Sequence, residues 1–226
     1  MSGFNRLALF DCDGTLVDSQ HAIITAMAAG FISQGLTPPP DEAVRRQVGL
    51  SLDAAVLGLL PVDADLGVAA GIATAYKDAF YENRTRGAVM EPLYPGLVEA
   101  LDALEAAGFL LGVATGKSHR GLVATLDHHG LNGRFITLQT ADRAQGKPSP
   151  DMALRAMAEA GADPATTVVI GDTSYDMVMA RNAGTAALGV AWGYHAPEEL
   201  MAAGAARVCH DYAEVPAAVA ALVAAS

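Results

Sequence analysis

The sequence predicts an α/β protein with a doubly wound, Rossmann-like parallel sheet as its core and an all-helical segment inserted into it. An apolar run, Leu7 to Phe10, leads directly into the acidic cluster D-C-D-G-T. A short apolar run that ends in turn residues is typical of a buried strand in a parallel sheet. No further strand signal follows until about Phe109, and from there apolar strands alternate with helical stretches. This alternation indicates a parallel sheet with helices on both faces.

Between the first strand and the rest of the sheet, the periodicity is helical. We expect helices over residues 21–32, 43–48, 52–60 and 68–83. The chain is therefore divided into a core, residues 1–16 and 90–226, and a helical cap domain, residues 17–89. The expected linkers between them are residues 16–19 and 87–94.

From Pro95 onward, strands and helices follow one another closely. Glycines end several of the predicted helices, since glycine readily adopts the left-handed conformation found at helix C-termini. The predicted strands are residues 109–114, 135–137, 167–170, 186–190 and 206–208. The predicted helices are residues 97–107, 118–129, 150–160, 174–182, 197–202 and 215–224.

Length, composition and charge restrict the size of the fold and the kinds of partner that the protein can have. The 226 residues suffice for one domain with a smaller insert and for a full core. The net charge of −11 argues against nucleic acid or an anionic membrane as a partner. The two cysteines, Cys12 and Cys209, form neither a disulfide framework nor a zinc pattern. Since neither a signal peptide nor a membrane span is recognisable, we expect a cytoplasmic location. A monomer and a homodimer are both open.

The first strand delivers two carboxylates, Asp11 and Asp13, to its carboxyl end, where open α/β sheets bind ligands. Two anions held this close need a cation or a shared proton, which predicts a Mg²⁺ site. One carboxylate can attack as a nucleophile while the other exchanges a proton with a leaving group. The alternative is a solvated turn that caps the next helix, with Asp18 or Ser19 as the N-cap.

The strand at residues 109–114 ends in Thr115 and Gly116. The threonine hydroxyl and the neighbouring amides can hydrogen-bond a phosphate at a helix N-terminus. The stretch is not a P-loop, because that pattern requires glycine where Leu111 stands. For Lys117 the sequence leaves two interpretations, a contact with the phosphate or a position on the surface.

Two further motifs supply charge. Prolines on both sides of Ser149 stiffen the loop G-K-P-S-P-D. A stiff loop holds the Lys147 ammonium in a fixed position, which a contact with carboxylates and a phosphate requires. Asp172 follows a buried apolar strand and can share a cation with Asp11, while Asp176 can orient the metal's waters or Lys147. The alternative places Asp172 at a helix N-cap, with Asp176 complementing the helix dipole.

Taken together, the motifs D-C-D-G-T-L-V-D-S, V-A-T-G-K, G-K-P-S-P-D and G-D-T-S-Y-D-M resemble the four motifs of the haloacid dehalogenase superfamily. The position of the helical insert is similar to that of the cap domain in the phosphoglycolate phosphatase-like subgroup. The resemblance implies that Asp11 is the nucleophile, which forms an aspartyl-phosphate, and that Asp13 is the general acid and then the base.

The same resemblance implies the ligands of the metal and of the phosphate. Mg²⁺ would be held by the Asp11 carboxylate, the Asp13 backbone carbonyl and Asp172, with Asp176 in support. The phosphoryl group would be bound by Thr115, Gly116 and Lys147. Gly116 departs from the family pattern, because related phosphatases often carry Asn or Ser there.

The activity that this resemblance implies is hydrolysis of small phosphorylated metabolites, with 2-phosphoglycolate as one candidate. Asp13 favours phosphatase or phosphomutase over dehalogenase chemistry, since a halide leaving group needs no proton. Arg45, Arg46 and Gly49 resemble part of a cap specificity loop, although a solvated helical face is an equal reading for the two arginines. A sugar phosphomutase (β-phosphoglucomutase-like) and, more remotely, a phosphoacceptor signalling module are the alternative functions.

Overall fold

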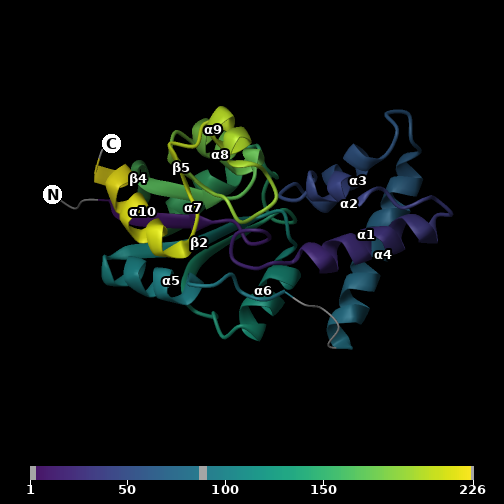
Figure 1. The fold of residues 1–226 in the computed structure, drawn as a ribbon, viewed down its shortest axis with the longest axis horizontal. Helices are drawn as coiled ribbons and strands as arrows, with labels where there is room; N and C mark the ends of the chain where they lie inside the picture. The colour runs from purple at the N-terminus through teal and green to yellow at the C-terminus, as the bar shows by residue number, and fades with distance from the viewer. Residues whose placement is uncertain (1–3, 87–90, 225–226) are drawn as a thin grey trace.

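The computed structural model describes residues 4–86 and 91–224, which form a sheet domain and a helical insert beside it (Figure 1). The strands are β1 (Asn5–Phe10), β2 (Phe109–Thr115), β3 (Phe135–Thr140), β4 (Ala162–Gly171), β5 (Ala186–Val190) and β6 (Arg207–Cys209). The insert contains α1 (Gln20–Ser33), α2 (Asp41–Arg45), α3 (Leu52–Leu59) and α4 (Leu66–Thr85). The sheet domain contains α5 (Leu97–Ala106), α6 (His119–His128), α7 (Asp151–Ala160), α8 (Ser174–Ala183), α9 (Pro197–Ala203), the 3₁₀-helix η1 (Tyr212–Glu214) and α10 (Val215–Ala224).

The strand order β3-β2-β1-β4-β5-β6, with every pair parallel, is that of a doubly wound sheet. From β1 the chain proceeds outward to β3, and from β4 it proceeds outward on the other side to β6. The winding therefore reverses between β1 and β4. In sheets of this kind, ligands bind outside the carboxyl ends of the strands at this reversal. The predicted fold class is confirmed.

The central strand β1 is apolar on both faces because helices cover both faces. Ala8 and Phe10 belong to one buried cluster, together with side chains of α5, α6 and α10. Leu7 and Leu9 belong to the opposite cluster, with side chains of α7, α8 and α9. All four residues are fully buried, so the strand holds whatever follows it in a rigid position.

The helical insert has a hydrophobic core of its own. Its fully or nearly buried members include Ile23, Met27, Phe31, Val56 and Ile72. The two segments that connect it to the sheet domain lie side by side: Val17 forms a bridge with Leu93, and the Asp18 N–H donates to the Pro92 carbonyl at 2.9 Å. The division at residues 17–89 remains a prediction, since residues 87–90 of the second linker lie outside the described residues.

Three of the predicted elements differ from the observed ones by three or more residues at one end. Strand β3 extends to Thr140, because residues 138–140 continue the ladder with residues 113–115 of β2. Strand β4 begins at Ala162, which pairs with Asn5 before the register shifts. The predicted helix 43–48 is instead α2 followed by a turn, and Gly49 has a φ of +96°. These differences arise from pairing between strands and from local turns, which helical or strand periodicity does not encode.

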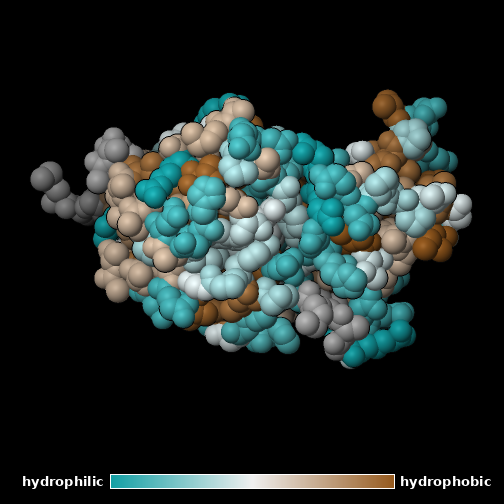
Figure 2. Space-filling model, in the orientation of Figure 1, coloured by the Kyte–Doolittle hydropathy of each residue, from teal (hydrophilic) through white to brown (hydrophobic). Residues whose placement is uncertain are grey.

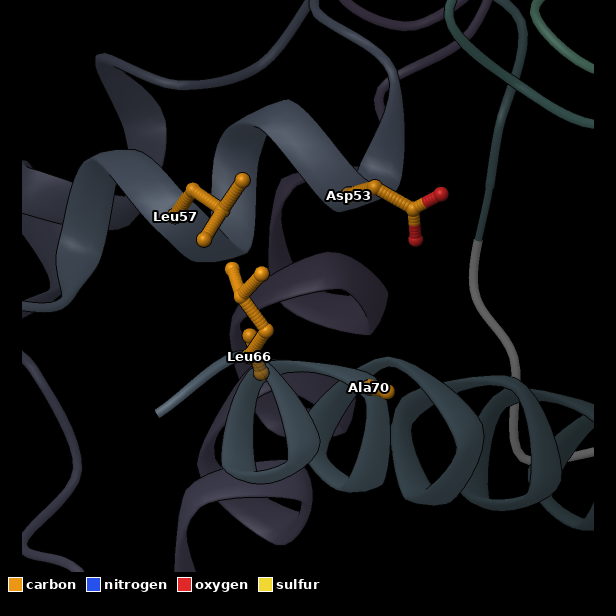
Figure 3. A pocket seen from close by; sticks show the side chains of 5 residues that line it. Asp53, Leu57, Leu66 and Ala70 are labelled. Atoms are coloured by element: carbon orange, nitrogen blue, oxygen red, sulfur yellow. The ribbon is translucent and has the colours of Figure 1, made fainter. Parts of the chain in front are cut away.

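The insert carries hydrophobic side chains on its outer surface. Figure 2 shows hydrophilic residues over much of the face in view and hydrophobic residues at the outer end of the insert. Between α3 and α4 a hollow is lined by Asp53, Leu57, Leu66, Ala69 and Ala70, with the two leucines facing each other (Figure 3). Within residues 4–86 and 91–224, no helix combines the length and hydrophobicity that a bilayer crossing demands.

Candidate active site

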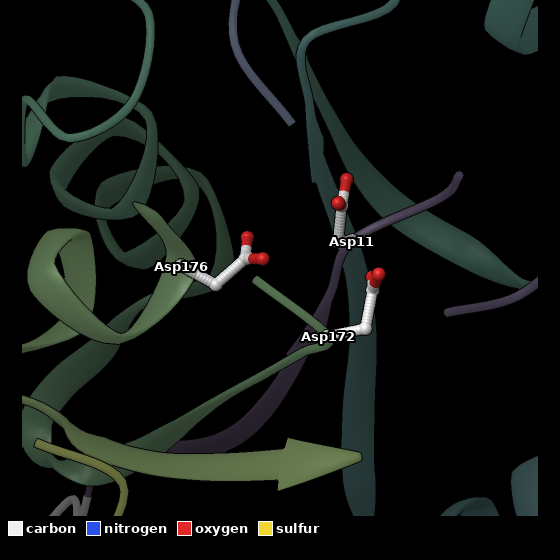
Figure 4. A group of neighbouring side chains, drawn as sticks. All are labelled: Asp11, Asp172 and Asp176. Atoms are coloured by element: carbon white, nitrogen blue, oxygen red, sulfur yellow. The ribbon is translucent and has the colours of Figure 1, made fainter. Parts of the chain in front are cut away.

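Three buried carboxylates converge where the winding of the sheet reverses. Asp11 directly follows β1, Asp172 directly follows β4, and Asp176 lies in the first turn of α8 (Figure 4). One oxygen of each lies within 4.8 Å of one oxygen of each of the others. The parallel pairing of β1 with β4 accounts for this meeting, and it continues beyond the strands, where the Asp11 N–H donates to the Ile170 carbonyl at 2.9 Å.

Lys147 provides the positive charge inside this cluster. Its Nζ lies 2.8 Å from Asp11 Oδ1 and 2.6 Å from Asp176 Oδ1, and its side chain is fully buried. Burial alone would lower the pKa of Lys147, but the Asp11 and Asp176 carboxylates raise it above its usual range. The lysine therefore stays charged and fixes the two acids relative to each other.

One ammonium does not neutralise three carboxylates. Burial and the remaining negative charge raise the pKa values of Asp11 and Asp172. Burial, opposed by Lys147 and reinforced by Asp176, raises the pKa of Asp11 from 3.8 to about 7. Burial and then the charges of Asp11 and Asp176 raise the pKa of Asp172 well above its usual value. Asp11 Oδ2 is buried and has no hydrogen-bond partner among the residues that the structure describes. An excess of carboxylate oxygens with one of them unpaired fits a divalent cation.

Asp172 is oriented by groups from two other segments. The Thr15 hydroxyl donates to its Oδ1 at 2.7 Å, and the Tyr194 N–H donates to its Oδ2 at 2.9 Å. Gly14 has a φ of +86°, and a Cβ at this position would overlap both Asp172 Oδ2 and the Tyr194 ring. The glycine of D-C-D-G-T is thus required because the first and fourth motifs touch there.

Asp176 is held by a capping box at the start of α8. The N-cap is Thr173, whose N–H and hydroxyl donate to Asp176 Oδ2 at 3.1 and 2.6 Å. The alternative with Asp172 at the N-cap is wrong. Because Thr173 occupies that position, the Asp172 carboxylate is free to face Asp11.

Asp13 has a lysine of its own. Lys117 Nζ lies 2.6 Å from Asp13 Oδ1 and 2.9 Å from Glu91 Oε1, and the lysine side chain is only 10% exposed. The alternative of a surface lysine is therefore wrong. Glu91 was not identified from the sequence; an acid beside Pro92 where the insert rejoins the sheet domain is its only local signal.

Thr115 and Gly116 lie at the end of β2, at the same edge of the sheet as the acids. The Thr115 hydroxyl accepts a hydrogen bond from the Lys117 N–H at 3.2 Å. A Cβ at Gly116 would overlap the Leu50 carbonyl oxygen. This contact explains why Asn or Ser would not fit at position 116, since the loop of the insert packs against the backbone there.

The residues expected to set specificity lie at the junction of the insert and the sheet domain. Gly49 packs against Thr173, since a Cβ there would lie 3.0 Å from the threonine hydroxyl. Arg46 pairs with Glu199 at 2.7 Å, and its carbonyl accepts a hydrogen bond from the Tyr175 hydroxyl at 3.0 Å. Arg45, by contrast, is engaged within the insert, with Gln20 and Glu42. Their roles in specificity remain predictions.

Known proteins resemble this chain over nearly its whole length. The "Probable phosphatase IndB" of Dickeya dadantii (strain 3937) is 37% identical over 96% of this chain and 94% of that protein. A phosphoglycolate phosphatase of Caulobacter vibrioides is 34% identical over 92% of this chain and 88% of that protein. The crystal structure of "a predicted phosphatase from Clostridium acetobutylicum" has a TM-score of 0.85 at 25% identity, over 97% of this chain and 100% of that one. Residues 8–190 match the family described as haloacid dehalogenase-like hydrolase, and the chain belongs to that family.

Proposed function

We propose that this protein is a Mg²⁺-dependent phosphatase that hydrolyses small phosphorylated metabolites through an aspartyl-phosphate on Asp11. The observation that carries the proposal is the convergence of Asp11, Asp172, Asp176 and Lys147 in one buried cluster. Relatives that are named phosphatases support the same reaction class.

Asp11 is the nucleophile. Its Oδ1 is held by Lys147 and accepts from the Cys12 N–H at 2.6 Å, so the carboxylate has a fixed direction. Attack on phosphorus forms the Asp11–phosphate bond and breaks the bond between phosphorus and the ester oxygen. A pre-oriented nucleophile contributes to catalysis because the entropic cost of alignment has been met on folding.

Asp13 is the general acid in the first step and the general base in the second. It gives its proton to the ester oxygen as the alcohol leaves, and it then takes a proton from the water that hydrolyses the aspartyl-phosphate. The resemblance to the haloacid dehalogenase motifs implies both roles, and the position of Asp13 two residues beyond Asp11 at the same strand end supports them. General acid–base catalysis of this kind contributes typically 10²- to 10⁴-fold to the rate.

The phosphoryl oxygens are bound by Lys147, the Thr115 hydroxyl and the backbone amide of Gly116. Mg²⁺, held by Asp11, the Asp13 carbonyl and Asp172 with Asp176 in support, would neutralise negative charge on those oxygens. Positioning and charge neutralisation supply most of the catalysis in phosphoryl transfer.

The helical insert acts as a cap, and its loop at residues 47–51 determines which substrates fit. Support comes from the packing of Gly49 on Thr173 and of Leu50 on Gly116, which brings this loop next to two of the four motifs. One candidate substrate is 2-phosphoglycolate, since the relative from Caulobacter vibrioides is named a phosphoglycolate phosphatase. Asp13 also fits a sugar phosphomutase, which would isomerise its substrate without releasing phosphate.

The test is a screen of phosphorylated metabolites with purified protein and Mg²⁺, in which released phosphate is measured. The panel contains 2-phosphoglycolate, sugar phosphates and hexose 1-phosphates, and the control is Asp11→Asn. Phosphate release that depends on Asp11 supports the phosphatase. Isomerisation of a hexose 1-phosphate with no phosphate release from any compound would establish the phosphomutase instead.

A further inference from the structure

Each carboxylate of the D-C-D motif has its own lysine, fully buried in the case of Lys147 and nearly buried in the case of Lys117, and each lysine has a second acid as partner. Lys147 links Asp11 to Asp176, and Lys117 links Asp13 to Glu91. The two arrangements are alike in chemistry and in distance, with all four Nζ–oxygen separations between 2.6 and 2.9 Å. The first arrangement fixes the nucleophile. The second has the same construction around the residue that exchanges protons.

Glu91 is the centre of the second arrangement, because it touches several elements at once. Its carboxylate contacts Lys117, the Arg84 guanidinium at the end of α4, and the Thr125 hydroxyl on α6. Its backbone carbonyl accepts a hydrogen bond from His129 Nε2 at 2.7 Å. The Glu91 side chain is 4% exposed. An acid held by side chains of α4, of α6 and of the loop after β2 has a fixed position, so it presents a fixed negative charge to Lys117.

The need for Glu91 follows from the burial of Lys117. A nearly buried ammonium is costly unless carboxylates surround it. Asp13 alone would supply one partner, and the lysine would then be free to follow Asp13 or to turn toward solvent. With Glu91 in place, Lys117 is fixed from the opposite side, and the position of Asp13 Oδ1 is fixed with it.

We propose that Lys117 and Glu91 are positioning residues for Asp13, an inference that rests on the proposed phosphatase function. They hold Oδ1 of Asp13, so that the other oxygen, Oδ2, is aimed at the ester oxygen of the substrate. When the phosphorus–oxygen bond breaks, its electron pair goes to the ester oxygen, and the Asp13 proton moves to that oxygen. Through Arg84, the same network connects the orientation of the Asp13 carboxylate to the end of α4 in the helical insert.

The leaving group provides a direct test. A good leaving group, such as p-nitrophenolate, departs without a proton, whereas a simple alkoxide needs one. The ratio kcat/KM reports events up to formation of the aspartyl-phosphate, so it isolates this first proton transfer. We therefore compare kcat/KM for p-nitrophenyl phosphate and for alkyl phosphates in wild type, Glu91→Gln and Lys117→Met, all with Mg²⁺.

We expect kcat/KM for alkyl phosphates to fall about 10- to 100-fold in both variants and that for p-nitrophenyl phosphate to stay within about threefold. Glu91→Asp, which retains the charge, should recover part of the loss. The control is Asp127→Asn on the exposed side of α6, which leaves the Asp13, Lys117 and Glu91 side chains unchanged. It should change kcat/KM for all substrates by the same factor.

Equal losses for both substrate classes in Glu91→Gln and Lys117→Met would overturn the proposal, because a loosened fold affects every leaving group alike. If Glu91→Gln does not fold, Glu91→Asp is judged by the same criterion. Asp13→Asn separates this inference from the proposed function. If Asp13→Asn shows the leaving-group dependence and the other variants do not, only the positioning role is lost. If even Asp13→Asn shows none, the acid role of Asp13 fails and the inference fails with it.

Discussion

Replacement of Asp11 by Asn should stabilise the metal-free protein, by an amount that increases with pH. Burial is the main reason that the pKa of Asp11 is raised from 3.8 to about 7. Because folding raises the pKa of Asp11, the contribution of this group to the free energy of unfolding is fully present below pH 3.8, its pKa in the unfolded chain. That contribution is lost as the pH rises through about 7, its pKa in the folded protein. At about 1.4 kcal/mol for each pKa unit, the whole loss amounts to about 4 kcal/mol.

Asparagine has nearly the same shape as protonated aspartate and does not ionise, so the variant keeps the free energy of unfolding that wild type loses as the pH rises. We expect the free energy of unfolding of Asp11→Asn to exceed that of wild type by about 2 kcal/mol near pH 5 and by about 4 kcal/mol near pH 8. Urea denaturation in EDTA at the two pH values, followed by circular dichroism, measures this difference. The control is Asp127→Asn on the exposed side of α6, which should change stability by less than about 0.5 kcal/mol at either pH.

Two results would refute this reasoning. A difference between Asp11→Asn and wild type that does not vary with pH would show that Asp11 is already ionised in the folded protein near pH 5, so that folding does not raise its pKa to about 7. A variant that is less stable than wild type at both pH values would show that the contacts of Asp11 with Lys147 outweigh the cost of burying its charge.

Four further outcomes are expected. Asp11→Asn should have no measurable phosphatase turnover, and residual turnover above about 1% of wild type would contradict its role as nucleophile. EDTA should abolish phosphate release and added Mg²⁺ should restore it, together with an increase in Tm that depends on the Mg²⁺ concentration. Lys147→Met should destabilise the protein by about 3–5 kcal/mol in urea denaturation, because two buried carboxylates lose their common cation; a loss below about 1 kcal/mol would contradict this. Gly14→Ala should lower Mg²⁺ affinity in a titration followed by Tm, since the added methyl overlaps Asp172 Oδ2, whereas Gly130→Ala, which has open space around it, should leave that affinity unchanged.

The sequence alone determined the fold class and the main acids of the candidate site. The apolar run before Asp11 and that before Asp172 mark buried strands, and this signal is local because every residue of such a strand meets the core. The sequence also marked Lys147, through the stiff loop that carries it. In each case the signal lies within ten residues of the functional side chain, where periodicity and turn chemistry can be read.

Tertiary structure decided which charges face one another. Lys117 is 104 residues from Asp13 and 26 residues from Glu91 along the chain, and no local pattern indicates either pairing. Likewise, Arg46 pairs with Glu199 across 153 residues. The physical reason is that a partner at such a separation is chosen by how strands and helices pack. A sequence pattern fixes which residues are buried, but only packing fixes their neighbours.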